Sequence, residues 1–277
     1  MSTDTRTEPA VHASEDPQPA AAAVPPSSPP RRPGALSVFR SEWIKLRSTR
    51  SPWWCMLVAL VVPMTFGALI TADSGEEIAI FFSLAGMQFA AAVVLVLAAL
   101  AVTGEYRYGT IRTTLQAQPS RARVLWTKAA VIAGVAFLIG ELAAFATYGV
   151  SKFFDTAGRL ALRTADDWRM VAGYGVVYAL LAVIAVAVGS LVRHPAGAVP
   201  LLLIWALAVE NLVLLIPSVG ADIYRLLPFV NGTLFAGDPM ITGVTDPLST
   251  LGSLGLLAGV AFGLLGVATA VLKRRDA

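Results

Sequence analysis

Residues 170–192 read MVAGYGVVYALLAVIAVAVGSLV and contain no charged side chain. A helix of about 20 apolar residues crosses the hydrocarbon core of a bilayer, which is about 30 Å thick. None of the apolar stretches alternates polar and apolar residues as a barrel strand does, and lipid offers no water to an open backbone. The sequence therefore predicts an all-α membrane protein with six transmembrane helices, the other five at about 53–70, 78–102, 129–150, 198–216 and 249–272.

The composition excludes several classes of protein. Of the 277 residues, 56% are hydrophobic and only 14% are charged, whereas a soluble globular chain has about 25% charged residues. A soluble enzyme and a nucleic-acid-binding domain are therefore not expected, and the net charge of +3 lies mostly beside the spans. One Cys and two His give no disulfide framework, no catalytic set and no metal site.

The distribution of Lys and Arg predicts the orientation of the chain. Cytoplasmic loops carry an excess of these residues. Fifteen of them lie on the side that holds the two ends of the membrane domain, and the opposite side has five: Lys152, Arg159, Arg163, Arg169 and Arg225. We expect a multi-pass plasma-membrane protein with both termini in the cytoplasm.

Two segments precede the first span. Residues 1–34 hold eight of the 17 prolines and are expected to form a disordered cytoplasmic tail, which leaves 35–277 as the membrane domain. Residues 35–50 are expected to form an amphipathic helix on the membrane surface, because their apolar side chains share one face. The alternative is a basic flank that happens to be helical. The residues of this face are Leu36, Phe39, Trp43 and Leu46.

The segment between the second and third spans, residues 104–118, begins GEYRYGTIRTTL. Tyr108, Ile111 and Leu115 share a face at helical spacing. This pattern predicts a short amphipathic cytoplasmic helix that would act as a lever on both spans, and the alternative is a solvated basic loop. Ser120 is expected to cap the helix that becomes the third span.

Two carboxylates are the charged residues within the six apolar stretches. Glu141 and Glu210 each lie about 18 Å from the start of a span at 1.5 Å per residue, and Gln88 and Tyr178 fall near the same level. Charges inside a membrane usually face a partner or a cavity. Two readings stay open: hydrogen bonding between helices, with Tyr178 or Gln88 as partners, or a lining of the translocation path that attracts a cationic substrate.

The last span contains glycines at every fourth position, at Gly255, Gly259 and Gly263. Small residues at this spacing let helix backbones approach closely. We expect them to pack within the subunit, and a seam between two subunits is the alternative.

Several motifs resemble the permease subunits of type 2 ABC transporters, with the closest likeness to those of actinobacteria. They are EWIKLRS at 42–48, TGEYRYGTIR at 103–112 and the Pro119-Ser120-Arg121 segment that follows. The resemblance implies a connecting helix at 35–50 and two permease subunits, identical or sister chains, around an export path. It also implies a coupling helix that docks on a cytoplasmic ATPase through Glu105, Tyr106, Arg107, Tyr108, Ile111, Arg112 and Leu115.

The chain has no P-loop motif, and no Gly-Lys pair at all. It is therefore not expected to be an enzyme, and ATP and Mg would bind in a partner ATPase. Two other functions remain open at this point. One is a proton-coupled secondary transporter that uses Glu141 and Glu210, and the other is a membrane anchor or sensor that transports nothing.

Overall fold

A computed structural model describes residues 50–73, 80–109, 120–156, 158–237 and 247–274, and within these ranges it contains helices and no strand. Six helices are long and apolar enough to cross a membrane. The predicted all-α fold with six spans is therefore confirmed. The spans run over Trp53–Asp73, Met87–Arg107, Ala122–Phe154, Ala165–Val192, Pro195–Val213 and Thr250–Arg274.

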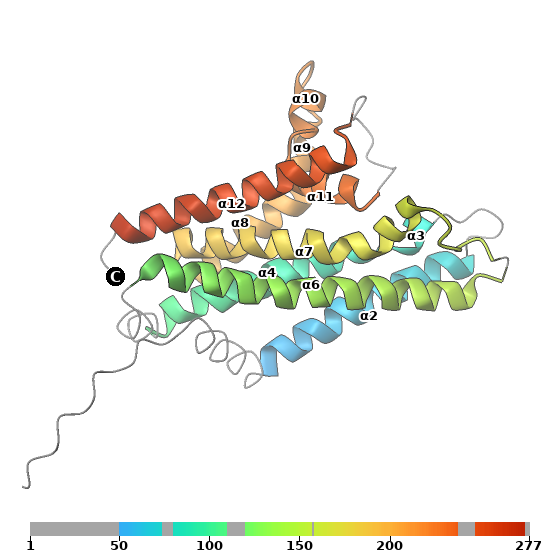
Figure 1. Ribbon diagram of the computed structural model, residues 1–277, viewed down its shortest axis with the longest axis horizontal. Coiled ribbons are helices and arrows are strands. Elements are labelled where there is room, and N and C mark those ends of the chain that lie inside the picture. Colours follow the sequence, from blue (N-terminus) through green and yellow to red (C-terminus); the bar gives the residue numbers. More distant parts are fainter. Residues whose placement is uncertain (1–49, 74–79, 110–119, 157, 238–246, 275–277) are drawn as a thin grey trace, which may run out of the picture. The chain divides into compact units, whose positions relative to one another are not determined.

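The elements follow one another along the chain as shown in Figure 1. The first four spans are α2 (Arg50–Asp73), α4 (Met87–Arg107) after the short α3 (Ile80–Ser83), α6 (Arg121–Phe154) and α7 (Ala165–Val192). The fifth span is divided into α8 (Pro195–Ile204), the π-helix η1 (Trp205–Val209) and α9 (Glu210–Val213). After it come α10 (Gly220–Tyr224), α11 (Pro228–Phe235) and the last span, α12 (Thr250–Arg274).

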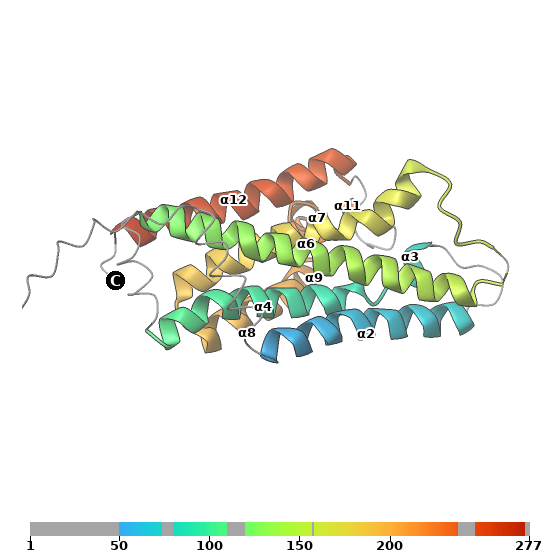
Figure 2. The same cartoon turned by 60° about the horizontal axis from the view of Figure 1, so that its bottom comes forward.

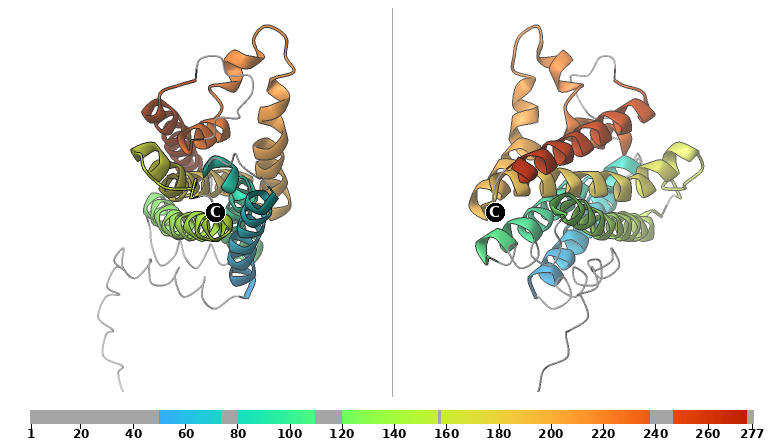
Figure 3. Two further views of the ribbon diagram at one scale, coloured as in Figure 1. Left: turned by 90° about the vertical axis from the view of Figure 1, so that its right-hand side faces the viewer. Right: turned by 60° about the vertical axis from the view of Figure 1, so that its left-hand side comes forward.

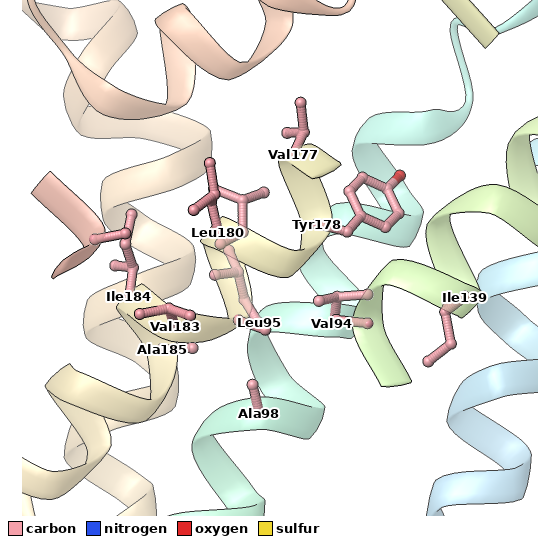
Figure 4. Packing of buried hydrophobic residues seen from close by; sticks show 14 of the residues in the cluster. Val94, Leu95, Ala98, Ile139, Val177, Tyr178, Leu180, Val183, Ile184 and Ala185 are labelled. Carbon is pink, nitrogen blue, oxygen red and sulfur yellow. The ribbon is translucent and has the colours of Figure 1, made fainter. Parts of the chain in front are cut away.

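Helix α7 forms the centre of the bundle, where it packs against α4, α6, α8, α11 and α12. Figure 2 shows α6 and α7 lying along each other between α4 and α12. Val94 and Leu95 of α4 meet Tyr178 and Val183 of α7 in the close view of Figure 4. All four side chains are buried. Tight packing of this kind, rather than a difference in hydrophobicity from lipid, holds helices together in a membrane.

Glycine allows α6 and α7 to approach closely. A Cβ added at Gly140 of α6 would lie 2.8 Å from the backbone oxygen of Tyr174 and 2.9 Å from Cα of Gly175, both on α7. A Cβ at Gly175 would in turn lie 2.2 Å from Oε1 of Glu141. The backbone contacts at Gly140 leave no room for a side chain on α6, whereas a side chain at Gly175 would have to displace the carboxylate of Glu141.

The two helices that flank the segment 110–119 extend further than the hydropathy pattern predicts. Helix α4 continues to Arg107, so Glu105, Tyr106 and Arg107 belong to the second span rather than to a separate coupling helix. Helix α6 begins at Arg121, and the side chain of Ser120 accepts a hydrogen bond from the backbone N–H of Arg123 at 3.4 Å. The predicted N-cap is confirmed.

The glycine stripe of α12 does not pack against the other residues that the structure describes. A Cβ added at Gly255, Gly259 or Gly263 would meet no atom of these residues within 4 Å. Another face of α12 makes the contacts, with Leu257, Ala261 and Leu265 buried against the rest of the described bundle. The expected packing of the glycines within the subunit is therefore not observed among the described residues.

The fifth span leaves the bundle along its length. It starts after Arg193, a non-glycine residue with φ 59°, and Pro195 occupies the first turn of α8. Helix α8 packs on α4 and α7, whereas η1 and α9 pack mainly on their sequence neighbours. Figure 3 shows α9 and α10 projecting away from the other helices.

Several predictions concern residues outside the described ranges. The Pro-rich tail, residues 1–34, and the surface helix with Leu36, Phe39, Trp43 and Leu46 are among them. The central residues of the expected coupling helix, Ile111, Arg112 and Leu115, also lie outside.

Candidate functional site

The divergence of the fifth span creates a cavity of about 510 Å³. It lies between α4, α7, η1 and α9, with α10 and α11 closing one side. The backbone N–H of Glu210 bonds to the oxygen of Trp205, five residues earlier, so the π-helix widens the span beside the cavity. Polar groups from five elements line it: Gln88, Tyr174, Tyr178, Glu210, Asn211, Tyr224 and Thr233.

Glu210 holds the N-terminus of α11. Its Oε2 accepts the N–H of Val230 at 2.8 Å, and its Oε1 accepts the N–H of Phe229 at 3.2 Å. The indole N–H of Trp205 donates to the same Oε1 at 3.0 Å. A helix N-terminus has N–H groups without partners in the helix, and a carboxylate satisfies them well. Glu210 is thus hydrogen-bonded, as one of the two interpretations expected. Its donors are Trp205 and two backbone N–H groups, however, and not Tyr178 or Gln88.

The other end of α11 is held by Arg169, on the first turns of α7. Its guanidinium donates to the backbone oxygen of Phe235, the last residue of α11, and also to Asp166. Along its length α11 packs closely, since a Cβ added at Gly232 would lie 3.1 Å from Val177 of α7 and 3.5 Å from Leu257 of α12. Helix α11 is thus fixed to the fourth, fifth and sixth spans.

Tyr178 and Gln88 both line the cavity but differ in their surroundings. Tyr178 is buried, and its hydroxyl donates to the backbone oxygen of Met87 rather than to a carboxylate. Its ring meets that of Tyr174 edge-on at 5.9 Å. Gln88 is exposed at the start of α4. The structure therefore brings Gln88, Tyr178 and Glu210 to one cavity.

Glu141 is separate from this group, because it is not among the residues that line the cavity. It is half-buried on α6, with its carboxylate against the backbone of Gly175 at the crossing with α7. The estimate of equal depth treated each span as starting at its apolar edge. In fact α6 begins at Arg121, eight residues before the predicted start, and the helices are not parallel.

A second polar cluster lies where α4 ends and α6 begins, and it contains Glu105, Tyr106, Lys128 and Arg193. We call this end of the bundle the basic end. Glu105 of α4 and Lys128 of α6 form an ion pair of 2.8 Å with side chains 8% and 4% exposed. The guanidinium of Arg193 lies 5.4 Å from the ring centre of Tyr106. Beyond this cluster the chain faces outward at the end of α4, where Tyr108 is 75% exposed.

The sequence reading missed Lys128 and Arg169, which it counted only as charges flanking spans. Lys128 forms an ion pair with Glu105, and Arg169 donates to the backbone oxygen of Phe235. Both partners are far away in sequence. A signal was available for the first pair, since an acidic residue ends one span and a basic residue begins the next. No sequence signal marked the backbone N–H groups that bind Glu210.

The opposite end of the bundle has a structured connection between α6 and α7. The pKa of Asp155 is held well below its ordinary value by the hydrogen bond from Lys152 Nζ. The backbone N–H groups of Leu160 and Arg159, at 2.8 and 3.1 Å, lower the pKa further, against the effect of burial. Thr164 and Asp167 then form a capping box that starts α7.

Six helices long and apolar enough to cross a membrane define a multi-pass membrane protein. Residues 38–215 match the model of a family described as "ABC-2 family transporter protein". The match covers well over half of the chain, which therefore belongs to this family. No curated protein matches the chain. The protein is a membrane permease of an ABC transporter, a class in which partner subunits hydrolyse ATP.

Proposed function

We propose that this permease forms the export path of an ATP-driven transporter in the plasma membrane, with both termini in the cytoplasm. The cavity beside the fifth span is the observation that carries the proposal. Its volume of about 510 Å³ lies within the range of small-molecule sites, about 300–1,000 Å³. The residues that line it do not include those of the basic end, where a cytoplasmic partner would act.

The basic end supports coupling to an ATPase. Tyr108 and Arg107 are exposed at the end of α4, immediately before the segment that resembles a coupling helix. In this proposal Tyr106, Arg107, Tyr108, Ile111, Arg112 and Leu115 carry or orient the contact with the ATPase, whose ATP and Mg drive the movement of the spans.

A second permease subunit, identical or a sister chain, completes the path in this proposal. Helices η1 and α9 expose large apolar side chains that do not line the cavity, including Val209 and Leu212, and the glycine stripe of α12 meets none of the other described residues. Both surfaces offer apolar area that lipid or a second subunit would cover. A cysteine at Leu212 should form a disulfide across the dimer if the fifth span lies at the interface.

Coupling is tested by replacing Ile111 and Arg112 together with Ala in the full chain. The permease, co-expressed with its partner ATPase, should lose co-purification or lose ATP-driven efflux while its thermal stability in detergent is unchanged. Unchanged coupling in the double variant would count against the assignment. Absence of ATP-driven efflux in the native complex would reject the exporter itself.

The path is tested with Glu141→Gln and Glu210→Gln in the same complex. We propose that at least one of these carboxylates faces the translocation route. The Glu210 variant should alter efflux of cationic compounds more than that of neutral ones, and normal efflux of every substrate by both variants would remove the carboxylates from the path. Neutral and cationic compounds of equal size serve as the internal control.

A further inference from the structure

We propose that Glu105 and Lys128 are positioning residues that join the two ends of the 108–120 connection, so that the ATPase moves α4 and α6 as one unit. The inference rests on the proposed function and assigns Glu105 a role different from the one implied by its motif. Its carboxylate does not face the partner, because its side chain is only 8% exposed and lies 2.8 Å from Lys128 Nζ.

The location of the pair distinguishes it from other ion pairs of the described residues. Lys152–Asp155, Arg169–Asp166 and Arg225–Asp222 each join residues three positions apart, and each includes a side chain at least 37% exposed. Such pairs contribute little beyond local order. Glu105 and Lys128 belong to different spans, and both side chains are at most 8% exposed. Burial makes the loss of either partner costly.

Neighbouring contacts extend the connection to other helices. Lys128 Nζ also lies 3.5 Å from the backbone oxygen of Ala101, one turn before Glu105. The adjacent Tyr106 meets Arg193 at the end of α7. Leu272 of α12 lines the small gap of about 20 Å³ at the pair. Four spans therefore meet at the point where the proposed coupling segment leaves the bundle.

The pair adds a directional contact to an apolar junction. The apolar side chains around the pair include Val102, Val124, Leu125 and Leu272. Apolar contacts have no fixed donor and acceptor, so they specify the relative position of two helices less sharply than a hydrogen-bonded ion pair does. An ion pair with a defined geometry fixes the register of the two helices. Without it, force applied to the segment would move the end of one helix past the other, and ATP hydrolysis would continue without moving the rest of the bundle.

The test uses the full permease with its ATPase in proteoliposomes. The single cysteine, Cys55, is changed to Ser, and spin labels are attached at Phe153→Cys on α6 and Leu251→Cys on α12, both highly exposed. Native protein should show a change in the label-to-label distance on trapping with ATP and vanadate. Glu105→Gln should keep hydrolysis within about twofold while the shifted population falls about tenfold, the scale on which a coupling network responds.

Rescue and stability controls separate positioning from folding. Glu105→Lys with Lys128→Glu should restore the shift, because it recreates the pair with reversed charge. Glu105→Gln with Lys128→Met leaves no unpaired buried charge and should fold normally, yet still lose the shift. Arg123→Gln, an exposed change on the first turn of α6, is the matched control and should behave as native.

The outcomes distinguish failure of this inference from failure of the proposed function. If native protein shifts and the neutral double variant folds and shifts equally, the pair is merely structural and the inference is wrong, while the exporter stands. If the reversed pair folds but fails to restore the shift, the inference is also wrong. If native protein shows neither ATP-dependent shift nor efflux, the proposed function fails, and the inference with it.

Discussion

Helix α7 and the fifth span have similar apolar sequences and very different surroundings. In the most apolar window of α7, 72% of the residues are buried, against 17% for Pro195–Val213. The interior of α7 is rich in small residues that admit neighbouring helices, such as Gly175, Ala182 and Ala185, whereas the fifth span exposes Leu207 and Leu212. Hydropathy identifies a span, but the distribution of small side chains decides which span becomes the centre of the bundle.

The largest effect should come from the helix crossing that defines the packed side of this comparison. Gly140→Leu would place a side chain against the backbone of α7, which cannot move aside, and should cost about 3 kcal/mol or prevent folding. Thermal unfolding in detergent measures the effect. Gly149→Ala, on the same helix with open space around it, is the control and should be neutral or slightly stabilising. Equal losses in both variants would refute the crossing.

A pair of identical substitutions compares the two spans directly. Leu181 on α7 is 3% exposed and Leu212 on α9 is 57% exposed. Leu181→Ala should lower the free energy of unfolding by about 2–3 kcal/mol because it leaves a cavity. Leu212→Ala should change it by less than about 0.5 kcal/mol in monomeric protein, as expected for a surface position. If denaturation curves gave similar values, the fifth span would have to be packed after all.

The cap at Glu210 links the divergent end of the fifth span to α11 and so to the bundle. Glu210→Gln retains one acceptor oxygen and should cost about 2 kcal/mol, because a charged acceptor and its pairing with N–H groups are lost. Hydrogen exchange at Phe229 and Val230 should rise. Asn211→Ala, one residue further along, removes an exposed side chain that bonds to Leu207 of the same span and to Tyr224 of α10 but not to α11, and it should leave that exchange unchanged.

The smallest predicted effect concerns the connection that leads into α7, and it depends on pH. Because the pKa of Asp155 is lowered by folding, its stabilisation is present above the ordinary Asp pKa, near 4, and is lost as pH falls through the lower folded value. Hydrogen exchange at Leu160 should therefore stay protected at pH 4. Asp155→Asn should reduce that protection about tenfold at neutral pH. Loss of native protection already between pH 6 and 5 would contradict the assignment.

The sequence was sufficient for the six spans, because each depends on a local property, the length of an apolar run. The N-cap at Ser120 was equally predictable, since its acceptor and donor lie three residues apart. The extent of α4 was not, because hydropathy ends at about residue 102 while the helix continues to Arg107. Glu105 was therefore assigned to a separate coupling helix, whereas it lies within α4 and pairs with Lys128 of the next span.

The polar groups of the cavity could also be predicted only in part from the sequence. Gln88, Tyr178 and Glu210 were placed together from their depth along ideal helices, and they do line one cavity. Depth alone could not separate Glu141 from them, since that depends on which way each helix faces. The two backbone donors to Glu210 could not be foreseen either, because they are main-chain groups 19 and 20 residues downstream. Side-chain chemistry can be read from a sequence, but the positions of exposed N–H groups depend on the fold.

Because α11 is attached at both ends, its position depends on the spacing between the fourth and fifth spans. Its N-terminus, with partial positive charge, meets a carboxylate from the fifth span, and its C-terminus, with partial negative charge, meets a guanidinium from the fourth. A helix of eight residues has a fixed length of about 12 Å and cannot stretch. Any change in the distance between Glu210 and Arg169 must therefore break one contact or tilt the helix, so a separation of the two spans is converted into a movement of the element that closes the cavity.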